Sequence, residues 1–120
     1  NVILEGNVSI AKNCSISAGS IIKDSQLGKE VKVKPYSVIE NSKIGNNSSI
    51  GPFAHVGPGA ELDKKVEVGN FVEVKRSKIS QKTKAKHLAY IGDGIIDSDV
   101  NIGAGTIFVK SPRLSILRLR

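Results

Sequence analysis

Two histidines, His55 and His87, could exchange a proton near neutral pH without help from their surroundings. His87 stands in TKAKHLAYIGDG, residues 83–94, directly after a lysine and three residues before Tyr90. A histidine in this setting is a candidate general base, and a lone surface histidine is the alternative. A zinc site of the hydratase type needs about three histidines, so we expect no metal site.

The composition of the chain favours short strands and turns over helices. Only 4% of the 120 residues are aromatic, and the apolar residues are mostly Ile, Val, Leu and Ala among twelve glycines. The net charge of +7 suggests an acidic partner, either nucleic acid or a phosphorylated small molecule. No aromatic stacking platform and no apolar run of transmembrane length are present, so we expect no nucleic-acid partner and no membrane. The single cysteine, Cys14, is compatible with a reducing cytosol, which predicts a cytoplasmic protein.

Aliphatic residues recur at every sixth position along most of the chain. Four steps of five residues interrupt this spacing, the first from Ile22 to Leu27. A helix would need apolar residues every three or four positions, and a hairpin sheet would need strict alternation. The spacing instead predicts hexapeptide repeats, in which a short strand and a tight turn form one side of a triangular coil. The recurring residues are Leu4, Ile10, Ile16, Ile22, Leu27, Val33, Ile39, Ile44, Ile50, Val56, Leu62, Val68, Val74, Ile79, Ala85, Ile91, Ile96 and Ile102.

These aliphatic residues should point into a narrow prism whose coils pair as parallel strands. Three hexads make one coil, so residues 4–107 predict an all-β parallel β-helix of about six coils. The residue four positions after each aliphatic one must be compact because it packs beside it, as Ser48, Ala54 and Val72 would. We expect residues 1–107 to form this domain.

Four segments carry more information than the period alone. They read IGPFAHVGPGAEL (50–62), VGNFVEVKRSKI (68–79), KAKHLAYIGDG (84–94) and NIGAGTI (101–107). In this order they resemble the acetyltransferase domain of the bacterial bifunctional enzymes that make UDP-N-acetylglucosamine, a precursor of peptidoglycan and lipopolysaccharide. The resemblance covers nearly all of residues 1–107.

The resemblance implies a fold, a reaction and an assembly. It implies a left-handed β-helix, a homotrimer, and acetyl transfer from acetyl-CoA to the amine of glucosamine-1-phosphate. Mg²⁺ is implied only for the N-terminal uridylyltransferase domain of these enzymes, which has no counterpart here. We therefore expect the chain to be a piece of a longer bifunctional enzyme.

The resemblance also assigns roles to residues in the third and second segments. His87 matches the base that removes a proton from the sugar amine. Lys75 and Tyr90 match residues that hold the sugar phosphate, for which an ammonium and a phenol are suitable donors. Glu73 matches a carboxylate near the base and could orient His87. A solvated charge on the coil surface is the alternative for Lys75 and for Glu73.

Three further positions complete the implied site. Asn101 matches a contact to the sugar, and the backbone at Ala104 matches a contact to acetyl-CoA. Gly57 stands where the family has a phosphate-binding arginine, for which His55 is a poor substitute. We therefore expect Gly57→Arg to improve sugar-phosphate binding.

The last thirteen residues depart from the family. After Ile107 the hexad stops, Pro112 breaks the run, and no carboxylate partner is evident for the arginines, which are Arg113, Arg118 and Arg120. We expect residues 108–120 to be a divergent, frameshifted or disordered tail that lacks much of the family's CoA site. This chain would then be impaired, and a catalytically inactive β-helix with only a structural or oligomerisation role is the alternative function.

Overall fold

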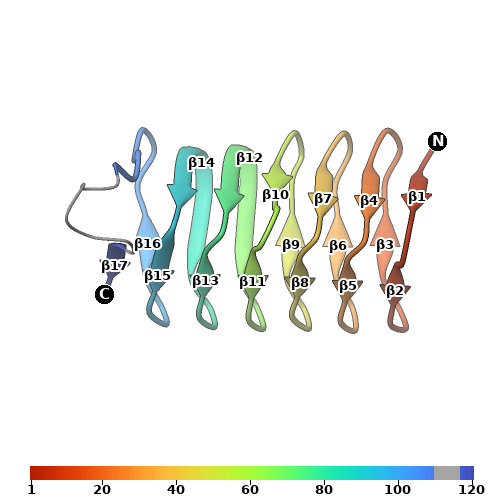
Figure 1. The fold of residues 1–120 in the computed structure, drawn as a ribbon, viewed down its shortest axis with the longest axis horizontal. Coiled ribbons are helices and arrows are strands. Elements are labelled where there is room, and N and C mark those ends of the chain that lie inside the picture. Colours follow the sequence, from red (N-terminus) through yellow and green to blue (C-terminus); the bar gives the residue numbers. More distant parts are fainter. Residues whose placement is uncertain (110–116) are drawn as a thin grey trace.

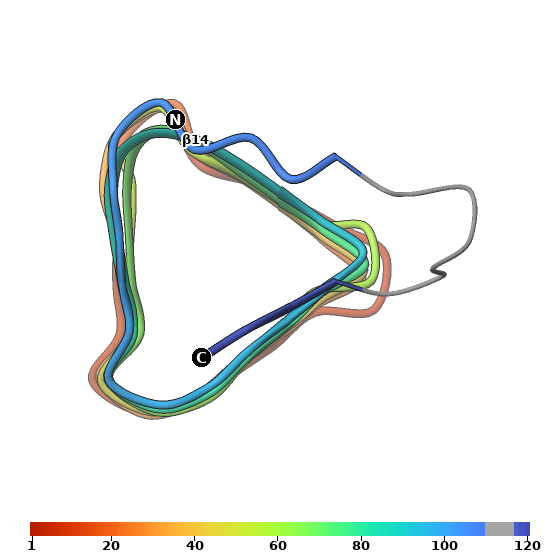
Figure 2. The same ribbon diagram turned by 90° about the vertical axis from the view of Figure 1, so that its left-hand side faces the viewer.

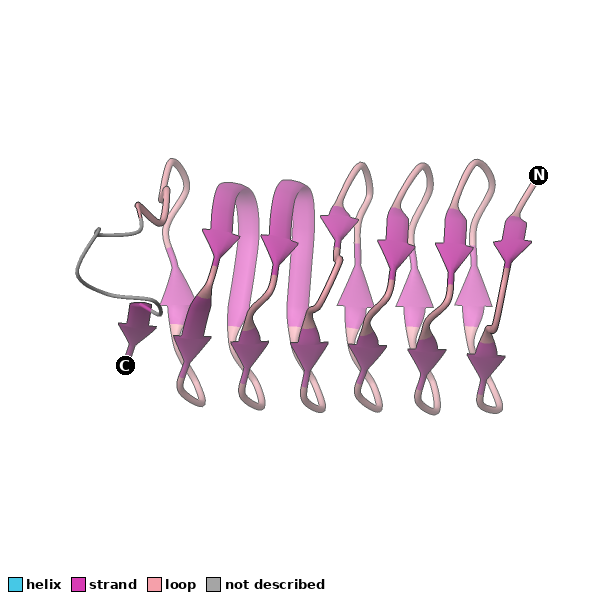
Figure 3. Ribbon diagram, in the orientation of Figure 1, coloured by secondary structure: helices cyan, strands magenta, loops and turns pink. Residues whose placement is uncertain are grey.

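The computed structural model describes residues 1–109 and 117–120, which form seventeen short strands and no helix (Figure 3). The strands wind into a triangular solenoid measuring 41 × 25 × 21 Å, with its coils side by side along the long axis (Figure 1). Viewed from the C-terminal end, the chain runs clockwise while it approaches the viewer, which makes the solenoid left-handed (Figure 2). The predicted all-β parallel β-helix of about six coils is confirmed. In the described part of the chain, nothing forms a helix that could cross a membrane.

Each coil has three sides, and the same side of successive coils forms one parallel face of the solenoid. Face one contains β1 (Ile3–Glu5), β4 (Ile21–Lys23), β7 (Val38–Glu40), β10 (His55–Val56) and the C-terminal halves of β12 (Glu67–Lys75) and β14 (Lys84–Gly92). Face two contains β2 (Ser9–Ile10), β5 (Gln26–Leu27), β8 (Lys43–Ile44), β11 (Glu61–Leu62), β13 (Lys78–Ile79), β15 (Gly94–Ile96) and β17 (Leu117–Leu119). Face three contains β3 (Ser15–Ile16), β6 (Lys32–Val33), β9 (Ser49–Ile50), β16 (Asn101–Ile102) and the N-terminal halves of β12 and β14.

The five-residue steps set the number of residues in each coil. They all fall where the chain passes from face one to face two, so a coil with one such step has 17 residues, as in the pairing of Ile21 with Val38. Where the step keeps six residues, from Val56 to Leu62, the coil has 18, as in the pairing of His55 with Glu73. A residue therefore stacks on the one 17 or 18 positions earlier, and we call such a stack a column.

One residue at each corner takes the left-handed backbone conformation, which Asn, Asp and Gly adopt most readily. Residues of other types take this conformation at all three corners, and the corner between faces three and one places Tyr36, Phe53, Phe71 and Leu88 at φ between 46° and 59°. The rings of Tyr36 and Phe53 stack with centroids 5.4 Å apart, and those of Phe53 and Phe71 with centroids 5.7 Å apart. We call this column the aromatic corner. Ring stacking along the axis offsets part of the cost of the backbone conformation.

The interior of the prism consists of the predicted aliphatic columns. Ile22, Ile39 and Val56 are completely buried, and the buried column that they form continues toward the C-terminal end of the solenoid. The compact positions are also buried, and Ser48 satisfies its hydroxyl by donating to the backbone oxygen of Asp63 at 2.9 Å. In the described residues no buried side-chain nitrogen or oxygen lacks a hydrogen-bond partner. Only the end of the stack differs, where Leu4 is exposed.

The described parts of the tail follow the solenoid. Phe108 donates its backbone N–H to Tyr90 at 3.0 Å and packs against the core, so the inward column continues one step past the expected end of the hexad. Strand β17 pairs in parallel with β15. Arg118 lies 2.9 Å and Arg120 3.8 Å from carboxylate oxygens of Asp97, so the expectation that these arginines lack carboxylate partners is wrong. Pro112 and Arg113 lie outside the described residues.

Candidate active site

His87 lies at the end of face three, one residue before the bend at Leu88. Asn70 is its neighbour in the same column, and the distance from His87 Nδ1 to Asn70 Oδ1 is 2.5 Å. An amide oxygen only accepts hydrogen bonds, so Nδ1 must carry the proton and donate it. In the neutral ring Nε2 is then unprotonated, which is the state a general base needs.

Sequence reasoning missed Asn70. The signal that finds it is the coil length, because Asn70 precedes His87 by 17 residues and the two positions pair directly. Gly69, next to it, allows the close approach of these two coils. A Cβ at Gly69 would collide with the backbone oxygen of Lys86, so the backbone next to His87 packs directly against this glycine.

A hollow of about 310 Å³ lies beside the base on face three. It brings together three of the predicted site residues, because His87, Asn101 and Ala104 all line it. Its other lining residues are Lys84, Lys86 and Ile102. The hollow is therefore lined by a candidate base, an asparagine and two lysines.

The predicted residues Glu73 and Lys75 lie on face one, around the aromatic corner from this hollow. Lys75 Nζ is 2.9 Å from Glu73 Oε2, and this hydrogen bond together with the charge of Glu73 raises the pKa of Lys75. His55 stands in the column of Glu73, with Nδ1 4.0 Å from Glu73 Oε2 and Nε2 2.8 Å from Glu40 Oε1. Within the chain, the partners of Glu73 are thus Lys75 and His55, and the side chain that contacts His87 is Asn70.

Tyr90 stands directly above Glu73 on face one. Its hydroxyl lies over Gly92, since a Cβ on Gly92 would come within 2.6 Å of it. Arg76 lies near this hydroxyl and binds Asp93 through two contacts, Nε to Oδ1 at 2.9 Å and Nη2 to Oδ2 at 3.2 Å. The pKa of Arg76 is raised first by Asp93, through a hydrogen bond and its charge, and to a smaller extent by Tyr90. Sequence reasoning missed this cation, although Asp93 follows Arg76 by one coil.

Gly57 occupies a position that no arginine can fill without strain. Its φ is +110°, and a Cβ there would collide with the backbone oxygen of Glu40 and approach Ser42 Oγ to 2.7 Å. The expectation that Gly57→Arg would improve phosphate binding therefore conflicts with the backbone geometry. The substitution should instead disturb the coil.

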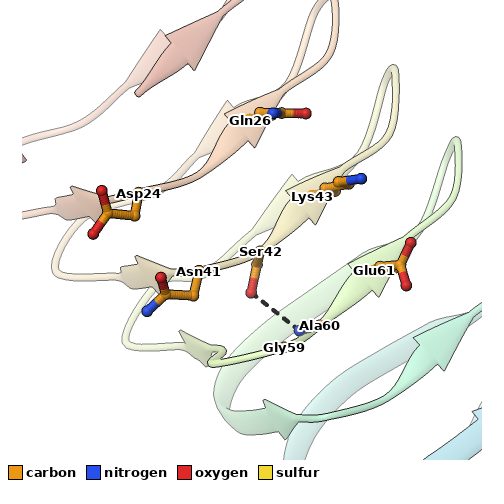
Figure 4. A pocket seen from close by; sticks show the side chains of 8 residues that line it. All are labelled: Asp24, Gln26, Asn41, Ser42, Lys43, Gly59, Ala60 and Glu61. Atoms are coloured by element: carbon orange, nitrogen blue, oxygen red, sulfur yellow. Dashed lines mark hydrogen bonds between the residues drawn. The ribbon is translucent and has the colours of Figure 1, made fainter. Parts of the chain in front are cut away.

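Another hollow, of about 420 Å³, lies away from His87 at the corner between faces one and two (Figure 4). It is lined by the polar side chains of Asp24, Gln26, Asn41, Ser42, Lys43 and Glu61, with Gly59 and Ala60. Ala60 donates its backbone N–H to Ser42 Oγ at 3.2 Å, and small residues at 59 and 60 open the space. It contains no histidine, so it offers no base near neutral pH. Residues 1–109 and 117–120 contain no group of three or more His, Cys, Asp or Glu that could hold a metal ion.

The sequence matches two families and a curated relative. The family described as GMPPB C-terminal domain matches residues 1–58, and the family of the bacterial transferase hexapeptide (six repeats) matches residues 41–76. The bifunctional protein GlmU of Baumannia cicadellinicola subsp. Homalodisca coagulata is 50% identical over 107 residues. That segment is 89% of this chain and 23% of the relative, so the chain spans about a quarter of the length of the relative.

Two crystal structures from Caulobacter crescentus, both in complex with CoA and GDP-perosamine, share the fold. One is a mutant GDP-perosamine N-acetyl transferase, with a TM-score of 0.53 and 13% identity. The other is PerB, with a TM-score of 0.54 and 14% identity. Each comparison covers 88% of this chain and 47% of the other, and at these identities the likeness concerns the fold alone. The chain is thus a hexapeptide-repeat β-solenoid homologous to a segment of the bifunctional protein GlmU.

Proposed function

We propose that this chain carries an acetyl-transfer site that moves an acetyl group from acetyl-CoA to the amine of glucosamine-1-phosphate. The observation that carries the proposal is His87, which lines a hollow together with Asn101 and Ala104 and whose Nδ1 contacts Asn70 Oδ1, so that the neutral ring leaves Nε2 unprotonated. The homology to a GlmU protein supports it, and the solenoid is also the fold of a GDP-perosamine N-acetyl transferase in complex with CoA. The proposal names both substrates by resemblance to the GlmU acetyltransferases.

One site residue acts as the base, and the others bind the two substrates. Nε2 of neutral His87 takes a proton from the sugar amine as the amine nitrogen attacks the thioester carbonyl. The new N–C bond forms a tetrahedral intermediate, which collapses with cleavage of the C–S bond, and the leaving thiolate takes up a proton. Asn101 contacts the sugar, and the backbone at Ala104 contacts acetyl-CoA. No metal ion is required for any of these steps.

Lys75, Tyr90 and Glu73 belong to the proposed sugar-phosphate site, but they lie on face one while His87 lies on face three. Outward side chains on adjacent sides of a triangular prism diverge, so one chain does not place both sets in one hollow. We therefore propose that face one of a second copy supplies them, within the homotrimer that the resemblance implies. Mixing a His87→Ala variant with a Lys75→Ala variant should then restore part of the activity, because some sites would contain both intact residues. Activity that stays at the level of the separate variants would overturn this arrangement.

The function is tested by release of free thiol from acetyl-CoA in the presence of glucosamine-1-phosphate. We expect transfer by the full-length protein that contains this segment, and little transfer by residues 1–120 alone, because a base without an oriented thioester gains little from proximity. No transfer by the full-length protein would reject the enzyme proposal and favour the inactive β-helix, in which the solenoid serves assembly only.

A further inference from the structure

The hollow beside His87 is lined by two lysines, Lys84 and Lys86, whose charges no carboxylate neutralises in the described residues. Within residues 1–109 and 117–120, neither Lys84 nor Lys86 has a carboxylate oxygen within 4.0 Å, whereas Lys75 and Arg76 are each paired. Unpaired cations in a concave site raise the local concentration of anions, and the chain as a whole adds to this field with a net charge of +7. Lys84 and Lys86 therefore differ from Lys75 and Arg76 in having no carboxylate partner among the described residues.

The residues that stack above and below Lys86 in its column are both glycines. In its column, Gly69 lies in the coil below and Gly103 in the coil above, since Lys84 pairs with Asn101 and Asn70 with His87. A Cβ on Gly103 would meet only Thr106 Oγ1, at 4.0 Å. The residues next to Lys86 in its column therefore place no side chain over it.

The chemistry of the proposed acceptor limits where its anion can lie. In a 2-amino sugar 1-phosphate, four bonds of about 1.5 Å separate the amine nitrogen from the phosphorus, so the two atoms are less than about 6 Å apart. If the amine reaches Nε2 of His87, the phosphate must lie in or beside the same hollow. Lys86 precedes His87 directly and lines that hollow with Lys84, whereas Lys75 of the same chain lies on another face.

We propose that Lys86, assisted by Lys84, binds the phosphate monoester of the acceptor sugar on the same chain as the base. This inference rests on the proposed function and adds a binding residue that distinguishes phosphorylated from unphosphorylated amino sugars. An ammonium contributes to this selectivity as a point charge with three donors, and its partner oxygens are charged. Lys75 and Tyr90 of a second copy would contact the same phosphate from the other side.

The experiment measures binding of glucosamine-1-phosphate and of glucosamine to residues 1–120 by NMR titration of the backbone amides. We expect Lys86→Ala to weaken glucosamine-1-phosphate binding about 10- to 100-fold, as expected for loss of a charged hydrogen bond, and to leave glucosamine binding unchanged. Lys86→Arg should retain most of the affinity. The matched control is Lys78→Ala on face two, whose ammonium is exposed and only 3.8 Å from Glu61; it should change neither affinity.

A second assay separates this inference from the proposed function. In the full-length protein, Lys86→Ala should lower kcat/KM for glucosamine-1-phosphate but not for glucosamine, with either acetyl-CoA or the phosphate-free donor acetyl-pantetheine. Equal losses for both acceptors, seen with acetyl-CoA and absent with acetyl-pantetheine, would assign Lys86 to the phosphates of CoA and overturn the inference. If the wild type transfers no acetyl group, the proposed function fails, while a phosphate-dependent loss of binding in Lys86→Ala would still support the phosphate site. Unchanged binding in Lys86→Ala overturns the inference in either case.

Discussion

The interior of the prism and its outer faces follow different rules, although the same backbone builds both. Inside, one column runs through Ile22 and Ile39 with the same chemistry in every coil. Outside, the column on face one changes from Val38 to His55 to Glu73 within two coils. The interior is constrained by burial in every layer, whereas an outer side chain has only its neighbours to satisfy. Residue types on the outer faces can therefore vary from coil to coil without destabilising the fold.

The largest effect should come from a charge placed inside. We expect Ile50→Asp to unfold the domain or to lower its free energy of unfolding by more than about 4 kcal/mol, because Ile50 is completely buried and a carboxylate there has no partner. Ser49→Asp, one residue away on the outer face, should change stability by about 0.5 kcal/mol or less. Thermal melting of both variants checks the difference, and equal losses would contradict the assignment of inside and outside.

The next effect concerns rate rather than stability. In the full-length protein, His87→Ala should lower acetyl transfer about 10²- to 10⁴-fold, the usual contribution of a positioned base. The melting temperature of the same variant should stay near that of the wild type, since His87 is exposed. Thiol release measured from pH 6 to 9 tests this, and a wild-type rate at every pH would remove the base assignment.

Gly57 is buried where the chain leaves face one, and its replacement should affect stability. We expect Gly57→Arg to lower the free energy of unfolding by about 1–3 kcal/mol, because its left-handed backbone strains any L side chain and its Cβ would face the backbone of Glu40. Gly57→Ala should show much of the same loss, since the strain begins at Cβ. Denaturant titration of the two variants measures it, and an arginine variant as stable as the wild type would show that the corner can rearrange.

Asn70 should affect the base without affecting the fold. Loss of one hydrogen bond to His87 Nδ1 is worth about 1 kcal/mol, so Asn70→Ala should lower acetyl transfer by roughly 5- to 10-fold. Asn70→Asp should keep an acceptor at the same place and retain more of the rate. If Asn70→Ala and the wild type had the same kcat, the imidazole would be held by other contacts.

The smallest effect is expected from the ion pair on face one. The folded-state pKa of Lys75 is raised above its ordinary value of 10.5 by Glu73, so the pair's contribution to stability is fully present below that value. It is lost as the pH rises through the folded-state pKa. The difference in melting temperature between the wild type and Lys75→Met should therefore be small at pH 7, shrink with added salt and vanish once the pH exceeds the folded-state pKa of Lys75.

The contrast between inside and outside also explains what the sequence could predict. The interior follows from spacing alone, because burial repeats the same residue class in every coil; Val56 and Ile91 were predicted this way. An outer contact depends on which residues stack, and that follows only once the five-residue steps are converted into coils of 17 or 18 residues. The pairing of Asn70 with His87 becomes visible only with this conversion.

Two other features needed coordinates for a different reason. The conflict at Gly57 arises from a backbone dihedral angle and from a carbonyl in the preceding coil, neither of which follows from residue type. The partner of Arg118 is Asp97, 21 residues earlier, so this pair does not follow the usual coil length. Geometry of this kind is set by the local path of the chain, not by the repeat.

The most direct test of the account is the tautomer of His87, because the proposed chemistry requires a bare Nε2. Two-bond proton–nitrogen NMR correlations on residues 1–120, recorded at a pH where the ring is neutral, report which ring nitrogen carries the proton. We predict protonated Nδ1 and unprotonated Nε2 in the wild type, with the opposite tautomer gaining population in Asn70→Ala. A wild-type ring protonated on Nε2 would contradict the account, because the nitrogen facing the substrate could not then accept a proton.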